Sequence, residues 1–437
     1  MDNPAFTFGE MLLNTRLVLS AWLICATIAP AWAATIPNTT MPTPLTLAQA
    51  QAIMLSHNRD LLAAQRGIAS AQANQLSATA RPNPQISINA TSINTHSIGA
   101  GGPYDKRIDS VLRVDQLVER GDKRELRIKT AQQLVRASVA DLTDITRQQL
   151  IALYNAYYDV AYAQDKIQLT RDAANLAESS QKKAELRLSA GDIAAAEVAR
   201  IQVDTLRAQN DAEQAIADAV NTRISLAYLL GMDNQPDQIQ VDDTWPAINT
   251  MTSQPDFNDL IAHRADVQAA QARVEAARQY KSLIRAQRTR DISVGAQFEH
   301  YPGASDNTVG VGISFPLLLG NNYEGDIRGA EISLSSAEDN LERVRALALG
   351  ELNRAQATLL SNQSRLQRYQ TSLLPAARRA MNAAEFGFAN GAISAVELLD
   401  ARRTWRAIQL EALSAQSDYA RALAIWRINT KTSQEKL

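Results

Sequence analysis

The sequence contains one helical-hairpin motif twice, at a constant spacing of 200 residues. The first copy, residues 185–218, begins ELRLSAGDIAAAEVAR, and the second, residues 385–418, begins EFGFANGAISAVELLD. Further matches lie upstream at a slightly different spacing, where His57 corresponds to His263. A repeat of roughly 200 residues has to be recognised before any fold is assigned. The mature chain is therefore predicted to be two copies of one unit that differ by insertions.

Each copy of the motif is predicted to be two helices joined by a tight turn. A long segment with apolar residues at helical spacing runs into Gly191 or Gly391, and a second such segment begins a few residues later. Glycine readily adopts the left-handed conformation that ends many helices, because it has no Cβ. The two glycines are expected at exposed tips, at equivalent places in the two halves.

The first 33 residues are predicted to be a secretory signal peptide. An apolar run, residues 17–29, is followed by Ala31-Trp32-Ala33, which has the small residues of a cleavage site. Two acidic residues close to Met1 suit such a signal poorly, so translation is expected to start at Met11. An uncleaved membrane anchor is the alternative, although the run is short for a span of about 20 residues.

Composition excludes several kinds of function. The only cysteine, Cys25, lies inside the predicted signal, so neither a disulfide nor a thiolate metal site is expected in the mature chain. Removal of the leader takes away two acids and one base, which changes the formal net charge from -2 to -1 and gives no basis for nucleic-acid binding. The four histidines lack ligand spacing and no nucleophile lies near a base, so we expect no metal site, no cofactor and no enzymatic activity.

Hydrophobic periodicity predicts the same order of elements in both halves. Three- and four-residue spacing indicates helices, and strict alternation, clearest at residues 292–298 and 309–315, indicates strands. Only 5% of residues are aromatic, which is typical of extended helices with thin, alanine-packed seams. The prediction begins with a signal at 1–33 and a first repeat at 34–230, which contains helix 45–80, strands 84–94 and 107–117, long helix 122–188 and return helix 194–230. A linker follows at 231–256. The second repeat, at 257–430, contains helix 257–289, strands 291–299 and 308–316, long helix 325–388 and return helix 394–429, and a tail at 431–437 ends the chain.

The lengths of the helices predict how they pack. The long helix of the first repeat would span about 100 Å, whereas the return helix is about half as long. A long helix cannot leave half of its apolar stripe in water, so the N-terminal helix of the same repeat should lie end to end with the return helix along it. Pro375 should kink the long helix of the second repeat. A coiled-coil seam is predicted at Leu150, Leu153, Tyr157, Val160 and Ile167.

The four predicted strands alternate apolar and polar residues, as one wall of a membrane barrel does. Four strands cannot close a barrel, and an open sheet edge in lipid would leave backbone groups unpaired. A membrane location therefore requires an oligomer, and a small soluble four-stranded sheet is the alternative.

This arrangement resembles the TolC-like outer-membrane efflux factors over essentially the whole mature chain. The most specific matches are the turns RLSAGDI at 187–193 and FANGAI at 388–393, while VDQLVERGDKR at 114–124 and FPLLLGNNYEGDI at 315–327 resemble the branch that serves cobalt-zinc-cadmium efflux pumps. The resemblance implies a mainly α fold with a membrane β-barrel. In that fold a homotrimer contributes four strands per protomer to one twelve-stranded barrel, continued by an α-helical coiled-coil tunnel across the periplasm of a Gram-negative bacterium.

The resemblance also implies roles for residues near the two turns. Glu397 and Asp400 would line the periplasmic aperture, and the exposed tips would meet a periplasmic adaptor protein that links the duct to an inner-membrane RND-type pump. The family's tyrosine is replaced by Phe388 and its basic partner by Ile393, so the closing contacts are expected to differ. The implied closed-state contacts are Glu197, Phe388, Arg200, Arg402 and Arg403, and the implied adaptor contacts are Ala190, Gly191, Asp192, Asn390, Gly391 and Ala392.

The sequence thus predicts a passive exit duct in the outer membrane, in contact with its lipid, for heavy-metal cations. Three alternatives stay open. A periplasmic adaptor also has long helical hairpins, but it would need lipoyl halves around a single hairpin. A soluble coiled-coil scaffold would leave the alternating strands unexplained, and a duct for drugs or organic solutes would show the same residues.

Overall fold

The computed structural model describes residues 44–91, 108–242, 244–248, 255–301, 305–317 and 320–430. The chain divides into two units, residues 1–42 and 43–437, and everything described here belongs to the second. The expected signal peptide, the expected C-terminal tail, residues 95–106 between the first two expected strands, and the strand ends predicted at 92–94 and 107 therefore lie outside the described residues.

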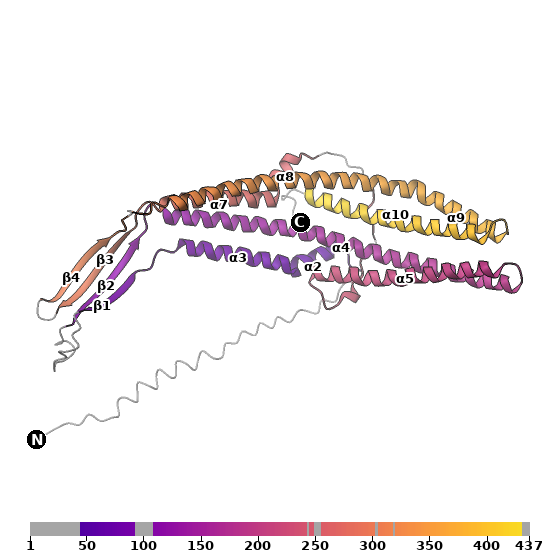
Figure 1. Cartoon of the computed structure of the whole chain (residues 1–437), viewed down its shortest axis with the longest axis horizontal. Helices are drawn as coiled ribbons and strands as arrows, with labels where there is room; N and C mark the ends of the chain where they lie inside the picture. The colour runs from indigo at the N-terminus through magenta and orange to yellow at the C-terminus, as the bar shows by residue number, and fades with distance from the viewer. Residues whose placement is uncertain are drawn as a thin grey trace, which may run out of the picture. The chain divides into compact units, whose positions relative to one another are not determined.

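Both repeats contain the same series of elements (Figure 1). The first repeat has α2 (Leu47–His57), α3 (Arg59–Thr79), β1 (Gln85–Thr91), β2 (Asp109–Val118), α4 (Lys123–Ser189) and α5 (Ala195–Leu230). The second has α6 (Phe257–His263), α7 (Ala265–Ala286), β3 (Ile292–Tyr301), β4 (Ser305–Ser314), α8 (Glu324–Arg368), the π-helical turn η3 (Tyr369–Leu373), α9 (Leu374–Ala389) and α10 (Ala395–Thr430). A short 3-10 helix, η2 (Pro236–Gln238), lies in the connection between them.

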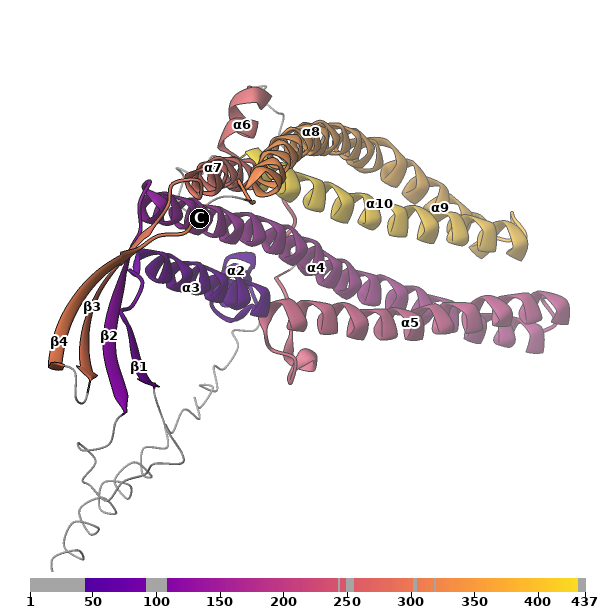
Figure 2. The same cartoon turned by 60° about the vertical axis from the view of Figure 1, so that its left-hand side comes forward.

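Each long helix is paired with two shorter ones, as Figures 1 and 2 show. α4 packs against α3 near the sheet and against α5 toward the tip, and α8 packs in the same way against α7 and α10. The two repeats are joined along α4, which also contacts α7 and α10. The seam predicted on α4 is buried at Leu150, Leu153, Tyr157 and Val160, while Ile167 is half-buried.

The predicted N-terminal helix of each repeat is broken, which is a correction to the single helices expected at 45–80 and 257–289. α2 ends at Asn58 and α6 ends at Arg264, and both residues have extended backbone. Asn58 is 2% exposed; its Oδ1 accepts from the amides of Asp60 and Leu61, and its Nδ2 donates to the Leu229 carbonyl at 3.0 Å. Asn58 therefore both caps α3 and ties it to the end of α5, and this buried capping competes successfully with helix continuation.

The long helix of the second repeat is interrupted at the place where Pro375 predicted a kink. Residues 369–373 form the π-helical turn η3, and the Leu374 amide donates to the Tyr369 carbonyl five residues earlier. A proline has no amide hydrogen and its ring collides with the carbonyl four residues before it. The wider turn removes that conflict, and α8 and α9 continue on either side of it.

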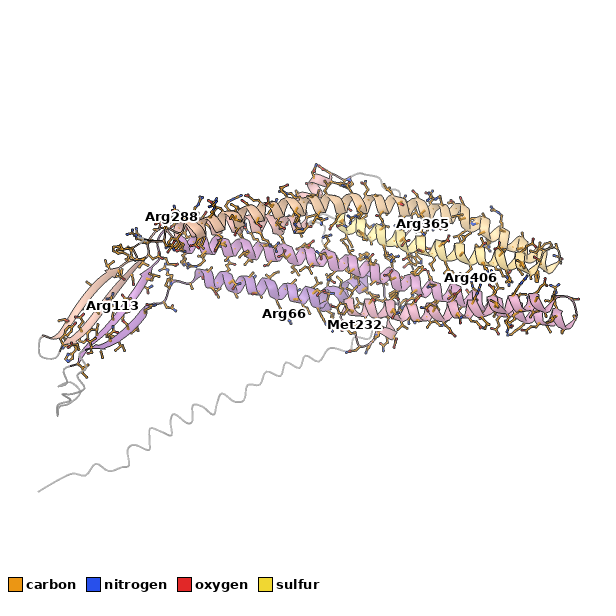
Figure 3. All side chains as sticks on the ribbon, viewed as in Figure 1. Arg66, Arg113, Met232, Arg288, Arg365 and Arg406 are labelled. Atoms are coloured by element: carbon orange, nitrogen blue, oxygen red, sulfur yellow. The ribbon has the colours of Figure 1, made fainter. Side chains whose placement is uncertain are left out.

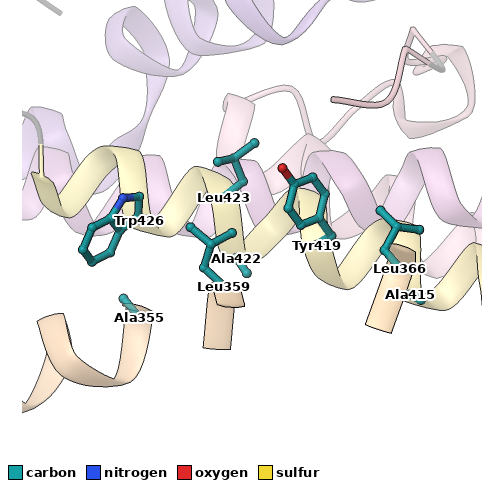
Figure 4. Packing of buried hydrophobic residues seen from close by; sticks show 8 residues of the cluster. All are labelled: Ala355, Leu359, Leu366, Ala415, Tyr419, Ala422, Leu423 and Trp426. Carbon is teal, nitrogen blue, oxygen red and sulfur yellow. The ribbon is translucent and has the colours of Figure 1, made fainter. Parts of the chain in front are cut away.

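The hydrophobic core is a set of thin seams between helices. In the second repeat α8 and α10 bury a row of small and large side chains against each other (Figure 4), namely Ala355, Leu359, Leu366, Ala415, Tyr419, Ala422, Leu423 and Trp426. Phe257 packs edge-on against Trp426, with 6.3 Å between the ring centroids. Alanine at alternate contacts lets the helix backbones approach closely, which explains how so few aromatic residues suffice.

The four strands form one antiparallel sheet in the order β1-β2-β3-β4. Gln85 pairs with Asp115 in the first hairpin, Val114 with Ala296 between the repeats, and Ala296 with Val311 in the second hairpin. β3 and β4 extend further toward each other than the predicted spans 291–299 and 308–316, because their register is adjusted between Glu299 and Tyr301 and pairing continues to Ser305. Within the described residues, β1 and β4 each have one edge that pairs with nothing.

The sheet is fastened to the helices by a buried lysine. Lys123, the first residue of α4, is 4% exposed, and its Nζ donates to the Thr289 carbonyl and to Asp291 Oδ1, both at 2.8 Å. Gly121, just before it, has φ +73°, and a Cβ there would lie 2.8 Å from the Cβ of Thr289. The glycine is thus required both by its backbone conformation and by the close approach of the second repeat.

Candidate functional site

The two tips of the helical hairpins have the same backbone structure. Gly191 has φ +81° and Gly391 has φ +73°. The Asp192 amide donates to the Arg187 carbonyl and the Ala392 amide to the Gly387 carbonyl, each at 2.8 Å. A Cβ on either glycine would meet nothing within 4 Å, so these glycines are required by the left-handed backbone alone.

The helices that leave the tips begin differently. At α10, Ser394 and Glu397 form a reciprocal cap: Glu397 Oε2 accepts from the Ser394 amide at 2.8 Å, and Ser394 Oγ accepts from the Glu397 amide at 3.4 Å. At α5 the equivalent residue is Ala194, which has no side-chain cap. Glu197 is therefore left without the serine that engages Glu397.

Below the turns the two hairpins pack against each other through an apolar group that we call the tip cluster. Ile201 and Ala184 of the first hairpin and Ala395 and Leu399 of the second are at most 6% exposed. Phe388 packs against this group, and the Arg187 guanidinium lies 5.3 Å from its ring centroid. A phenyl ring without a hydroxyl suits this position, since it contributes apolar area and a face for a cation. Partly buried Ile193 and Val198 complete the tip cluster.

Farther from the tips, three arginines of α10 bridge to the first repeat, and we call them the arginine ladder. Arg403 Nε lies 3.3 Å from Asp204 Oδ1, and Arg406 Nη1 lies 3.5 Å from Asp211 Oδ2 (Arg406 is labelled in Figure 3). Arg402 Nη1 donates to Ser180 Oγ at 2.7 Å, while its Nη2 contacts Glu385 within its own repeat. Asp204 is 7% exposed, so its charge is held largely away from water and depends on this pairing.

A further bridge between the repeats lies beyond the ladder. Arg421 of α10 donates to Asp159 of α4 and, at 2.9 Å, to Asp418 of its own helix. Burial raises the pKa of the Asp159 carboxyl, and the nearby Arg421 guanidinium only partly opposes that shift. The ladder and this bridge therefore pair arginines on α10 with carboxylates on α4 and α5.

The structure brings some of the predicted residues together and separates others. Arg402 and Arg403 contact the first repeat, and Phe388 joins the tip cluster. Arg200 and Asp400 are exposed and have no polar side-chain partner among the residues that the structure describes. The expected adaptor-contact residues are all exposed at the two tips: Ala190, Gly191, Asp192, Asn390, Gly391 and Ala392.

Sequence reasoning missed Ser180, Asp204, Asp211 and Arg406. Asp204 and Asp211 are seven residues apart on α5, and Arg403 and Arg406 are three apart on α10, so each pair lies on one helix face. This spacing was visible in the sequence. What the sequence did not contain was the alignment of α10 against α5, which depends on the packing of the tip cluster.

The sheet has two faces of opposite chemistry. Ile86, Ile88, Val309, Val311 and Ile313 share one face and are between 69% and 88% exposed. The other face has charged and polar side chains joined across three strands, including Arg113, Asp115, Gln297, Glu299 and Thr308. A water-soluble sheet buries its apolar face, whereas here that face is uncovered in the single chain.

Two further properties concern the described residues as a set. None of their helices has the length and hydropathy needed to span a bilayer. Their His, Cys, Asp and Glu side chains do not gather in threes in a way that could hold a metal ion.

The model of the family described as "Outer membrane efflux protein" matches residues 52–232 and 257–425, one segment in each repeat. Among curated proteins, the chain is 25% identical over 374 residues to the cobalt-zinc-cadmium resistance protein CzcC of Cupriavidus metallidurans. That alignment covers 83% of this chain and 84% of the relative.

Solved structures with the same fold include the outer-membrane channel OprN and CusC, whose structures are described in terms of transmembrane channel formation. OprN has a TM-score of 0.75 and 22% identity, and the match covers 88% of this chain and 89% of that one. CusC has a TM-score of 0.76 and 16% identity, with 89% and 92% covered.

Proposed function

Because this chain belongs to the outer membrane efflux protein family, we propose that it is the outer-membrane exit duct of a tripartite efflux system for heavy-metal cations. In this proposal three chains join their sheets into one twelve-stranded barrel and their helices into a tunnel across the periplasm. The tips meet a periplasmic adaptor, and an inner-membrane RND-type pump supplies the energy.

The observation that carries the proposal is the four-stranded sheet with an uncovered apolar face and two unpaired edges. The apolar face matches what lipid requires, and the polar face matches a water-filled lumen. In a bilayer the edges of β1 and β4 must find partners, since unpaired backbone groups there are very costly. Pairing β4 of one copy with β1 of the next satisfies both edges and yields a closed barrel.

The choice of cargo rests on the relative rather than on a binding site. CzcC is named as a cobalt-zinc-cadmium resistance protein and is similar along most of its length. In a duct, selection lies mostly in the pump, so a duct for drugs or organic solutes is the second candidate. Loss of cobalt, zinc or cadmium tolerance on deletion would favour the first candidate, and unchanged metal tolerance with new drug sensitivity would favour the second.

We further propose that the tips form the closed end of the tunnel. Around a threefold axis, Glu397 and Asp400, one turn apart on α10, would form two stacked rings of negative charge. Such rings attract cations while repelling one another, which suits an aperture that opens. The arginine ladder would hold the two hairpins of one protomer together in the closed state, with Arg200 and Glu197 available for contacts between protomers.

The test is the conductance of the purified, detergent-extracted protein in planar bilayers. Wild type should give small, cation-selective channels, and Glu397→Ala plus Asp400→Ala should change their size or selectivity. Glu324→Ala plus Asp326→Ala is the matched control, because it removes two acids from the first turn of α8 instead. A protein that never conducts would argue for an adaptor or a scaffold, and identical conductance in all three forms would place the gate elsewhere.

A further inference from the structure

The polar face of the sheet carries one connected set of side chains that spans three strands, and Figure 3 labels its arginine. Arg113 on β2 binds Asp115 through two bonds, Nε to Oδ2 at 2.7 Å and Nη2 to Oδ1 at 2.9 Å. Its Nη1 donates to Gln297 Oε1 on β3 at 3.2 Å. Gln297 in turn donates to Glu299, which also accepts from Thr308 Oγ1 on β4 at 3.2 Å. We call these five residues the strand network.

Charge is unevenly balanced in the strand network. The bidentate bond uses the charge of Arg113 to neutralise Asp115. The hydrogen-bond donors that reach Glu299 are an amide and hydroxyls, from Gln297, Thr308 and Tyr301, and all of them are neutral. Among the residues that the structure describes, no lysine or arginine pairs with Glu299. Glu299 is thus a fixed carboxylate whose charge is not cancelled.

Three glycines leave room for the side chains of the strand network to lie flat against the sheet. A Cβ on Gly295 would overlap Asp115 Oδ1 and lie 3.1 Å from Arg113 Nη2. A Cβ on Gly310 would lie 3.0 Å from Gln297 Cγ, and one on Gly312 would be 3.6 Å from Arg113 Nη2. The long side chains therefore extend across the backbone of β3 and β4 instead of projecting away from it. This leaves space in front of the sheet while the positions of the charges stay fixed.

We propose that Glu299 sets the ion selectivity of the barrel that the sheets form, as a cation-selecting residue separate from the aperture at the tips. The proposal rests on the proposed pore, in which the polar face lines the lumen. Three copies of Glu299 would then place a ring of uncompensated carboxylates at one level, and such a ring raises the local cation concentration and excludes anions. The Arg113–Asp115 pair lies beside this ring and adds no net charge to it.

The experiment compares two variants by reversal potential in a KCl gradient. Glu299→Gln keeps the side-chain shape and removes one charge per protomer, so the preference for K⁺ over Cl⁻ should fall by about threefold or more. Arg113→Gln plus Asp115→Asn changes more atoms but removes no net charge, so the preference should be kept. Recovery of both variants from the outer membrane in the wild-type oligomeric state serves as the check on folding.

The outcomes separate the two proposals. If wild type forms no channels, the proposed function itself is wrong. If wild type conducts and Glu299→Gln keeps its selectivity, the pore stands and the assignment of Glu299 is overturned. An equal loss in the neutral double variant would also overturn it, because the effect would then follow from disturbing the strand network and not from its charge.

Discussion

At the scale of single residues, the clearest difference between the repeats lies at the joint between their short helices. Asn58 and Arg264 occupy equivalent positions at the break between the two short helices of each repeat, and both are buried. Their side chains stabilise the break through different contacts. Asn58 caps α3 directly. Arg264 caps nothing; it binds Asp266 at 2.7 Å and Glu351 of α8 at 2.8 Å, while Asp266 accepts from the Val267 amide.

We expect Asn58→Ala to lower the stability of the first repeat by about 1–3 kcal/mol, since it removes a cap and leaves the half-buried Leu229 carbonyl without its donor. Thermal unfolding of the detergent-solubilised protein, followed by circular dichroism, measures the change. Asn74→Ala on the exposed face of the same helix is the control and should change the melting temperature little. Equal effects of the two substitutions would contradict the role given to Asn58.

Asp266 predicts a dependence of stability on pH. Burial alone would raise the pKa of Asp266, but hydrogen bonds and charge from Arg264 outweigh it, so the pKa is lowered. A lowered folded-state pKa stabilises the protein above the unfolded value of about 3.9, and this contribution is lost as the pH falls through the folded value.

We therefore expect Asp266→Asn to melt at a lower temperature than wild type at pH 7 and to lose less on acidification below pH 4. Melting curves at pH 7, 5, 4 and 3 measure both effects. Asp60→Asn is the matched control, because Asp60 is the equivalent residue of the first repeat and binds the neutral amide of Gln149. If Asp266→Asn lost as much melting temperature on acidification as wild type does, the role given to Asp266 would be wrong.

These joints also show what sequence could and could not predict. Periodicity predicted helices on both sides of Asn58 and Arg264, because the apolar spacing continues across them. The break depends on burial against α5 and α8, which are far away in sequence, and a local pattern contains no information about that. By contrast, Gly191, Gly391 and Pro375 act through their own backbone chemistry, so the turns and the interruption near residue 375 could be predicted.

At the scale of elements, the hairpins are joined by the arginine ladder and the tip cluster. Asp211 is exposed, so its pair with Arg406 contributes at most about 1 kcal/mol. Loss of Arg403 costs more, because it leaves the buried Asp204 charge unpaired. Three rungs acting together can still shift an opening equilibrium, since 1.4 kcal/mol corresponds to about tenfold in population.

We expect Arg402→Gln plus Arg403→Gln plus Arg406→Gln to raise mean channel conductance several-fold by favouring separation of the hairpins. Arg379→Gln, which replaces an exposed arginine of α9 outside the ladder and outside the proposed closed-state contacts, is the control and should leave conductance near that of wild type. Arg406→Asp combined with Asp211→Arg reverses the charges of one rung, and this double variant should conduct less than Arg406→Asp alone. A triple variant that conducts like wild type would show that the tip cluster alone holds the closed state.

At the scale of the whole molecule, the unpaired edges of β1 and β4 make a prediction about assembly. Because the only cysteine of the sequence is Cys25, Cys25→Ser gives a thiol-free chain into which engineered cysteines can be introduced. We expect Ser87→Cys on β1 to form a disulfide with a cysteine placed in turn at Thr308, Gly310, Gly312 or Ser314 on β4 of a neighbouring copy. Bridging requires Cα atoms about 4.4–6.8 Å apart, so only one or two of these positions should react.

Non-reducing electrophoresis would show the result as bands at two and three times the mass of the chain. Ser87→Cys combined with Ser293→Cys on the interior strand β3 is the control and should stay monomeric. Absence of cross-linked bands at every β4 position would mean that the edges are not partners of each other. The four strands and their alternation could be predicted from the sequence, but their register and open edges required the structure.

The arginine ladder is polarised between the repeats. The positions in the first repeat that correspond to Arg402, Arg403 and Arg406 are Gln202, Val203 and Leu206, and none of them is basic. Two identical halves would each carry both the arginines and the carboxylates, so the same ladder could recur at every contact between neighbouring hairpins of a ring. The divergence of the halves restricts these arginines to the second one. In the proposed ring of three chains, the six hairpins would then meet in two chemically different kinds of contact, three within chains that carry the ladder and three between chains, so that opening would follow threefold and not sixfold symmetry.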